Sequence, residues 1–484
     1  MDVIRNICKQ SLENIAERPA IISSKENISY LQLENKVHNA AKSLYSQGIR
    51  QHSKAAILSR NNCDYIICVL ALWELNACVI PLNIRLTDIE LSEIINFSEA
   101  EFLLIQKNEN RNLSIQVPKI ILPLGSSNSE TDIHASEINS NDISLIIFTS
   151  GVTGKPKGVV HSLKNLLNSA DNSQAFLSQS TDDKWLASLP FYHIGGLSII
   201  TRAIRFGSAI IIPDSLKNDD LKKAFDKFKP SFASLVSTQL QRLLKTDWEP
   251  GEELKNLLLG GGSADEELIR KAISVGCKIS NVYGSTETSA FISANSGINI
   301  KQKPLSAGKP LGKNKISIVD NELNPLPAGS SETILIESNA LFNGYFKDEE
   351  ATKKKLKDGK FLTGDIGFID GGGDLFIAAR RTDLIITGGE NVNPVEVENI
   401  LNKLPQVKEC CVFGLDDKEW GQIVAAAVVL NSPISILELA GFMKDKIAAY
   451  KIPKRFFPVE EIPKSSLGKI MREKVREEIN ILIK

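Results

Sequence analysis

The stretch FTSGVTGKPKG, residues 148–158, decides how the rest of the chain is interpreted. The short apolar run at 143–147 precedes it and is typical of a buried strand. After it, Ser162 is a preferred N-cap and the residues from Leu163 are typical of a helix. A glycine and hydroxyl loop between a strand and a helix presents backbone N–H groups to an anion. The same composition also suits a plain surface turn, but the two lysines of the loop favour an anion site.

The pattern T-S-G-x-T-G-x-P-K-G at 149–158 is not a Walker loop, because Pro156 stands where a second glycine is required. It resembles the phosphate loop of the acyl- and aryl-CoA synthetases, which belong to the adenylate-forming superfamily. The resemblance implies an ATP-dependent acid–thiol ligase that uses Mg²⁺ and takes coenzyme A as co-substrate. It implies that ATP phosphates are held by Thr149, Ser150, Gly151, Thr153, Gly154 and Lys157.

The chain has 484 residues, a length that predicts two or three domains rather than one core. Its net charge of −1 gives no reason to expect binding to nucleic acid. The apolar stretches are too short or too interrupted to span a bilayer, and the N-terminus lacks a signal layout. Seven scattered cysteines indicate free thiols in a reducing cytosol, so we expect a cytoplasmic protein without a membrane span.

Strands alternate with helices over roughly the first 300 residues, which predicts an α/β fold of mostly parallel sheets flanked by helices. From Ile316 onward, short strands separated by turns predict an antiparallel β subdomain. After Asp383, a helix, two strands and a helix predict a small α+β domain. The resemblance implies an AMP-binding domain at 1–380 and a mobile C-terminal lid domain at 381–484.

The motif YGSTET, residues 283–288, follows a predicted strand. A glutamate beside hydroxyls can hold Mg²⁺, although the same residues suit the capped start of a helix. The resemblance implies that Glu287 is the catalytic Mg²⁺ ligand and that Thr286 lies near phosphate. It also places Tyr283, Gly284, Gly261 and Gly262 along the adenine, with Gly260 and Ser285 beside the acyl group.

Three further motifs, taken alone, fit two ordinary turns and a solvated basic tail. The resemblance gives each a role. Asp365 binds the ribose hydroxyls, and Arg380 contacts ribose or phosphate. Gly388 and Gly389 line the path of the coenzyme A thiol arm, and Lys469 bridges the attacking carboxylate and the α-phosphate.

The segments 190–202 and 381–391 are most similar to the 2-succinylbenzoate–CoA ligases of menaquinone or phylloquinone biosynthesis. Such a substrate carries a second carboxylate, so we nominate Arg202 for anion contact in the acyl pocket. His193 is nominated as a catalytic or gating residue of the pocket, and it fits a packed histidine equally well. Another aryl- or medium-chain acyl-CoA ligase, or a non-catalytic carrier-loading module, stays open as an alternative. So does a homo-oligomeric state.

Overall fold

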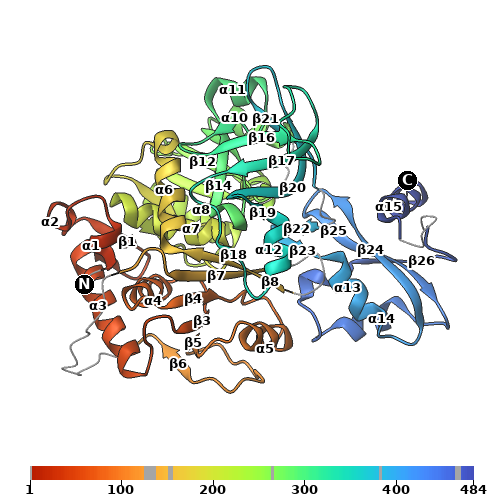
Figure 1. Cartoon of the computed structure of the whole chain (residues 1–484), viewed down its shortest axis with the longest axis horizontal. Coiled ribbons are helices and arrows are strands. Elements are labelled where there is room, and N and C mark those ends of the chain that lie inside the picture. Colours follow the sequence, from red (N-terminus) through yellow and green to blue (C-terminus); the bar gives the residue numbers. More distant parts are fainter. Residues whose placement is uncertain are drawn as a thin grey trace.

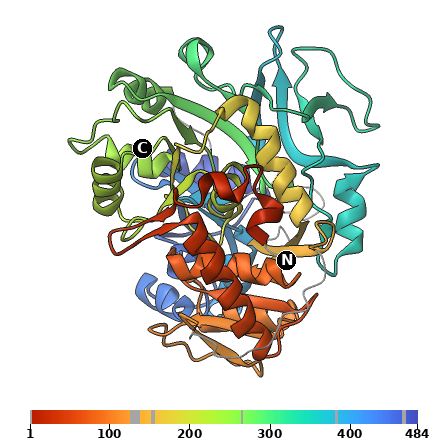
Figure 2. The same cartoon turned by 90° about the vertical axis from the view of Figure 1, so that its left-hand side faces the viewer.

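The computed structural model describes residues 3–124, 138–150, 156–262, 266–380, 384–463 and 470–483. In Figure 1 the large N-terminal part fills most of the molecule, and the segments after residue 384 lie in blue at the other end of the long axis from the N-terminus. Figure 2 shows the stacked sheets and helices of the large part from its N-terminal side. In the described part of the chain, no helix is long and apolar enough to cross a membrane.

The first sheet has the strand order β18-β8-β7-β4-β3-β5-β6, and its pairs from β7 to β6 are parallel. Its strands are β3 (Lys54–Leu58), β4 (Cys78–Pro81), β5 (Phe102–Gln106), β6 (Lys119–Leu122), β7 (Ile143–Ser150), β8 (Pro156–Ser162) and β18 (Gly344–Tyr345). The accompanying helices are α3 (Tyr30–Ser46), α4 (Cys63–Glu74) and α5 (Asp88–Phe97). Helix α4 is apolar on nearly every face, which predicts a buried helix, and nearly all of its residues are buried.

The second sheet has the order β15-β14-β13-β12-β11-β9-β10-β1-β2, parallel in its centre and antiparallel at both edges. Its strands are β1 (Pro19–Ile22), β2 (Asn27–Ser29), β9 (Lys184–Leu186), β10 (Ala209–Ile211), β11 (Phe232–Leu235), β12 (Asn256–Leu259), β13 (Ile279–Ser285), β14 (Ala290–Asn295) and β15 (Lys309–Pro310). The helices are α1 (Val3–Ile7), α2 (Leu12–Ile15), α6 (Leu163–Leu177), α7 (Ile194–Phe206), α8 (Asn218–Phe228), α9 (Ser237–Leu243), α10 (Glu266–Ser274) and α11 (Gly297–Gln302). Residues of α3, α4 and α7 join both sheets in one apolar core.

The predicted antiparallel subdomain is confirmed, because its main strands pair in antiparallel register. It contains β16 (Lys315–Val319), β17 (Glu332–Glu337), β19 (Leu356–Lys357), β20 (Lys360–Ile369), β21 (Leu375–Arg380) and helix α12 (Glu349–Lys355). The small domain contains β22 (Ile385–Thr387), β23 (Glu390–Val392), α13 (Pro394–Leu401), β24 (Val407–Asp417), β25 (Gly421–Leu430), α14 (Ile436–Met443), β26 (Arg455–Pro458) and α15 (Arg472–Leu482). Adjacent Cys410 and Cys411 pack into apolar clusters on opposite faces of its sheet, and all seven cysteines are free.

The predicted order of strand, loop and helix around residues 148–158 is wrong in one respect. Residues 156–162 form β8, which pairs antiparallel with β7 before the helix begins. The loop is therefore the tip of a hairpin and not the N-terminus of a helix. The N-cap prediction is confirmed, because Ser162 forms a reciprocal capping box with Asn165 at the start of α6.

Candidate active site

The hairpin of β7 and β8 carries the predicted phosphate loop at its tip. Thr149 lies opposite Lys157 in the register, and the Thr149 hydroxyl donates to the Lys157 carbonyl oxygen at 3.5 Å. The Lys157 ammonium lies 4.7 Å from the centre of the Tyr345 ring, in cation–π contact. Gly151, Thr153 and Gly154 lie outside the described residues, as does the Ser150 side chain.

Tyr345 connects this hairpin to the predicted metal ligand. Its hydroxyl donates to Oε1 of Glu287 at 2.9 Å. Burial and the neighbouring carboxylate raise the pKa of Tyr345, so the hydroxyl keeps its proton. Glu287 lies in a 3₁₀ turn, Thr286–Thr288, directly after β13 and keeps partial solvent access. One carboxylate with room for water and phosphate oxygens fits Mg²⁺. Sequence reasoning missed Tyr345, whose only local signal is the sequence Asn-Gly-Tyr at 343–345.

Tyr283 and Asp365 are far apart in the sequence and meet here. The Tyr283 hydroxyl donates to Oδ2 of Asp365 at 2.8 Å. Asp365 in β20 lies directly opposite Arg380 in β21, so the backbone of Arg380 is adjacent, while its side chain lies outside the described residues. The structure thus joins the predicted adenine residue to the predicted ribose residue, and Glu287 follows four residues after Tyr283, in the 3₁₀ turn.

The glycine turn after β12 faces the small domain. A Cβ atom placed on Gly262 would lie 3.7 Å from Ile386 in β22, and one placed on Gly389 would lie 3.1 Å from Val236. The same Val236 side chain lies 3.1 Å from a Cβ placed on Gly261. The glycine turn at 260–262, predicted along the adenine and the acyl group, and the predicted coenzyme A loop therefore both lie against Val236.

Gly388 and Gly389 form the two-residue turn between β22 and β23, where Thr387 pairs with Glu390. Their φ angles of +58° and +86° lie in the left-handed region that favours glycine. A Cβ on Gly388 would lie 2.8 Å from the Trp420 ring, so neither position accepts a side chain easily.

Glu390 directly follows this turn and was not identified from the sequence. Its carboxylate accepts from Arg85 Nη1 at 3.1 Å and lies 3.2 Å from Nε2 of His193. Burial alone would raise the pKa of Glu390, but His193 and Arg85 together bring it below its usual value. His193, nominated for the pocket, is thus linked to the coenzyme A loop of the other domain. The available signal was a charged residue between glycine and an apolar strand.

Arg202 in α7 is 2% exposed and has no acidic partner among the described residues. Its guanidinium lies 4.8 Å from the Trp185 ring and 5.0 Å from the Phe291 ring, and Nη2 donates to the Ser198 hydroxyl at 3.0 Å. Its Nε atom is buried without a partner in the described structure. Burial lowers the pKa of Arg202 to about 9, which leaves it charged at neutral pH.

Ser285, predicted beside the acyl group, is the last residue of β13. Phe291, which Arg202 contacts, pairs with Gly284, the residue before Ser285. The Ser285 hydroxyl is also buried without a hydrogen-bond partner among the described residues. Buried polar groups without partners, such as these two, are candidates for contact with a polar ligand. Lys469, the remaining predicted residue, lies outside the described residues.

Two family profiles match the chain. The AMP-binding enzyme profile matches residues 8–346, and the AMP-binding enzyme C-terminal domain profile matches residues 396–469. Among curated proteins, a 2-succinylbenzoate–CoA ligase of Bacillus licheniformis is 35% identical over 474 residues, covering 97% of this chain and 99% of that protein.

Solved structures of the o-succinylbenzoate CoA synthetase of Bacillus subtilis are also similar. A double mutant with the product analogue OSB-NCoA gives a TM-score of 0.90 at 29% identity, covering 98% of both chains. The same enzyme with the acyl-adenylate OSB-AMP gives 0.75 at the same identity and coverage. At the same identity and coverage, this chain therefore superposes better on the product-analogue complex than on the acyl-adenylate complex.

Proposed function

The chain belongs to the AMP-binding enzyme family, and we propose that it joins 2-succinylbenzoate to coenzyme A, using ATP and Mg²⁺, with AMP and diphosphate as the other products. Full-length similarity to 2-succinylbenzoate–CoA ligases supports this reaction. The molecules bound in the related structures also support it: ATP with magnesium, an acyl-adenylate and a coenzyme A product analogue.

The observation that carries the choice of acid is the buried Arg202. A buried cation without a carboxylate partner costs several kcal/mol of stability, in order-of-magnitude terms, and is retained where an anion meets it. A simple fatty acid offers only the carboxylate that is activated. The proposed substrate offers a second one on its ring, which fits a charge-assisted pair with the guanidinium.

In the first half-reaction the carboxylate attacks the α-phosphate of ATP and diphosphate leaves. The protein aligns these groups and neutralises the growing charge. We assign Lys157 and the loop at 149–158 to the phosphates, Tyr283 and Asp365 to the nucleoside, and Glu287 to Mg²⁺. When bound, Mg²⁺ neutralises charge on the phosphate oxygens. Lys469 would supply the cation at the α-phosphate.

In the second half-reaction the coenzyme A thiol attacks the acyl carbon and AMP leaves. We propose that the domain at 381–484 turns relative to the domain at 1–380 between the two steps, which withdraws Lys469 and brings the Gly388–Gly389 turn to the site. The contact of this turn with Val236 supports its role at the second step. The agreement with the product-analogue complex supports the same assignment.

A panel of carboxylic acids, scored by diphosphate release, tests the proposed acid. We expect 2-succinylbenzoate to support turnover and benzoate, 4-phenylbutyrate and octanoate to support little. Mass spectrometry with free coenzyme A should then find the thioester. Turnover with the monocarboxylic acids but not with 2-succinylbenzoate would exclude 2-succinylbenzoate as the substrate and would still support an acid–coenzyme A ligase. Transfer only to a carrier protein would favour a loading module.

Replacing Asp365 with alanine should raise the KM for ATP by about 10- to 100-fold, because a charged hydrogen-bond acceptor for the ribose is lost. Tyr283 would lose its partner at the same time. Steady-state kinetics at varied ATP measures this effect. Glu337→Ala, on the surface of the same subdomain, is the matched control and should leave the KM unchanged because exposed ion pairs contribute little. An unchanged KM in Asp365→Ala would remove Asp365 from the nucleotide site.

The proposed partners are small molecules only: the acid, ATP and coenzyme A. We propose the cytoplasm as the location, supported by the seven free cysteines, which suit a reducing compartment. A homo-oligomeric state stays a prediction.

A further inference from the structure

A buried ion cluster crosses between the two domains. The Lys451 ammonium lies 2.6 Å from Oε1 of Glu90 and 2.6 Å from Oε1 of Glu396. Lys451 and Glu396 belong to the small domain, whereas Glu90 belongs to α5 of the large domain. Lys451 is only 6% exposed and Glu90 only 8%. Bulk water therefore has little access to these two ion pairs while the domains stay in this arrangement.

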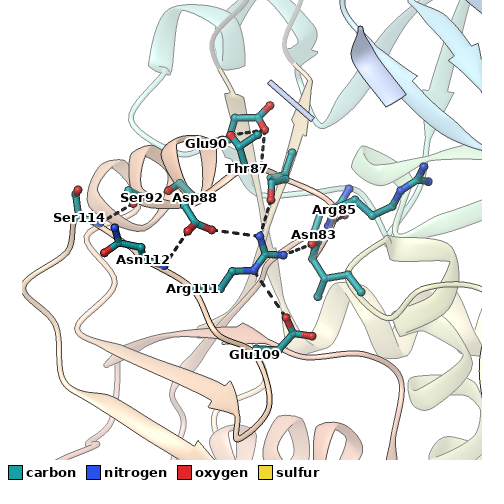
Figure 3. A network of polar contacts seen from close by, with 12 residues as sticks. Asn83, Arg85, Thr87, Asp88, Glu90, Ser92, Glu109, Arg111, Asn112 and Ser114 are labelled. Carbon is teal, nitrogen blue, oxygen red and sulfur yellow. Dashed lines mark hydrogen bonds and ion pairs between the residues drawn. The ribbon is translucent and has the colours of Figure 1, made fainter. Parts of the chain in front are cut away.

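The large-domain half of the cluster is held in place by its own domain. Oε2 of Glu90 accepts from the Thr87 amide at 2.8 Å and from the Thr87 hydroxyl at 2.9 Å, which forms the capping box of α5. Figure 3 shows this pair beside a network centred on Arg111, which contacts Asp88 and Glu109. Glu90 thus meets Lys451 without having to be ordered by it.

The small-domain half is connected to the coenzyme A loop. Glu396 lies in the first turn of α13, which Asn393 caps directly after β23 and the Gly388–Gly389 turn. Next to Lys451, Ala448 is buried in the apolar cluster around α5, and the Arg85 guanidinium lies 4.7 Å from the Tyr450 ring. These contacts tie the position of the Gly388–Gly389 turn to the contact between Lys451 and Glu90.

Glu90 would be left without its ammonium partner if the small domain moved away, whereas Glu396 would keep Lys451 within its own domain. Of the two ion pairs of Lys451, the one with Glu90 is therefore the one that depends on the domain arrangement. The related enzyme agrees less well in its acyl-adenylate complex, at a TM-score of 0.75, than in its product-analogue complex, at 0.90.

We propose that Lys451 is a positioning residue for thioester formation, which holds the small domain over the site through its contact with Glu90. The proposal rests on the proposed function in that it assumes two half-reactions with different domain arrangements. Lys451 touches no reacting atom. It favours the second arrangement, so its loss shifts the population of domain arrangements.

The test measures the half-reactions separately in Lys451→Met, with Lys403→Met as the matched control because Lys403 is an exposed lysine of the same domain. We expect single-turnover thioester formation from preformed acyl-adenylate to slow by about 5- to 100-fold, the range of typical coupling between states. Diphosphate release in the first half-reaction should not slow. Equal slowing of both half-reactions would mean a general structural role and would overturn the proposal.

Glu90→Gln is the second variant, because glutamine keeps the capping box of α5 and removes only the charge that Lys451 meets. It should reproduce the effect of Lys451→Met, and combining both changes should add little. Glu396→Gln should have the smaller effect, since this carboxylate stays in the domain of Lys451. If Glu90→Gln leaves thioester formation unchanged, the proposal fails even where Lys451→Met does not fold.

Hydrogen exchange without substrates gives a readout that does not depend on the acid. In Lys451→Met and Glu90→Gln, amides at 83–90 and 448–452 should exchange faster, while those of α3 stay protected as in Lys403→Met. Unchanged exchange at both segments would contradict the proposal. Failure of the acid panel alone would leave this result standing, so the two proposals fail separately.

Discussion

Replacing Lys469 with alanine should stop diphosphate release from ATP and the acid while leaving ATP binding intact. The reason is electrostatic: the attacking carboxylate and the α-phosphate are both negative, and the lysine neutralises charge that grows only in the transition state. Loss of such a group lowers kcat by about 100- to 1,000-fold. ATP binding should persist because the phosphate loop, Asp365 and Tyr283 are unchanged. Single-turnover diphosphate release and equilibrium ATP binding measure the two effects.

The matched control is Lys474→Ala, an exposed lysine of the same tail, which should behave like the unmodified chain. Thioester formation from supplied acyl-adenylate should survive in Lys469→Ala, since we propose that the turned small domain withdraws Lys469 at that step. A variant that loses both half-reactions equally, or that releases diphosphate normally, would show that Lys469 is not the adenylation lysine.

Replacing Arg202 with methionine should lower kcat/KM for 2-succinylbenzoate by about 100-fold or more, the usual effect of removing one partner of a buried charge pair. The monocarboxylic 4-phenylbutyrate makes no pair with Arg202, so its low kcat/KM should not fall and the preference between the acids should shrink. Methionine matches much of the arginine volume, and removing an unpaired buried charge should leave the melting temperature unchanged or higher. Kinetics with both acids and thermal unfolding measure these effects.

Arg205, one turn further along α7, is the matched control. It makes paired contacts with Asp171 at 2.9 Å each and donates to the Ile7 carbonyl oxygen at 2.8 Å. Arg205→Met should therefore lower stability by about 1–3 kcal/mol and leave the preference between the two acids unchanged. If Arg202→Met loses both acids equally and unfolds earlier, Arg202 is a packing residue and the choice of acid loses its main support.

Local patterns predicted the fold class well, because buried strands and capped helices have clear sequence signals. The start of α7 at Ile194 has no such clear signal. Gly195 and Gly196 disfavour a helix by propensity. The structure needs Gly196 because a Cβ there would lie 2.0 Å from the Pro190 carbonyl oxygen. Tertiary packing thus overrode a local preference.

The candidate site was predicted in parts. Tyr283, Asp365 and Glu287 could be nominated because each lies in a motif of its own, although their meeting could not be seen in any one segment. The contacts of Glu390 with His193 and of Lys451 with Glu90 could not be predicted in this way, since they join residues 197 and 361 positions apart. Contacts across a domain boundary depend on the arrangement of two folded bodies, and no local pattern encodes that arrangement.

Burial of the Lys451–Glu90 contact also bears on how the enzyme responds to dissolved ions. Added salt weakens ion pairs between exposed side chains, whereas buried pairs are screened much less. Another ion pair between the domains, Arg242 with Glu419, is 37% and 62% exposed and so is open to screening. We therefore expect added salt to weaken the contact of Arg242 with Glu419 while the contact of Lys451 with Glu90 persists.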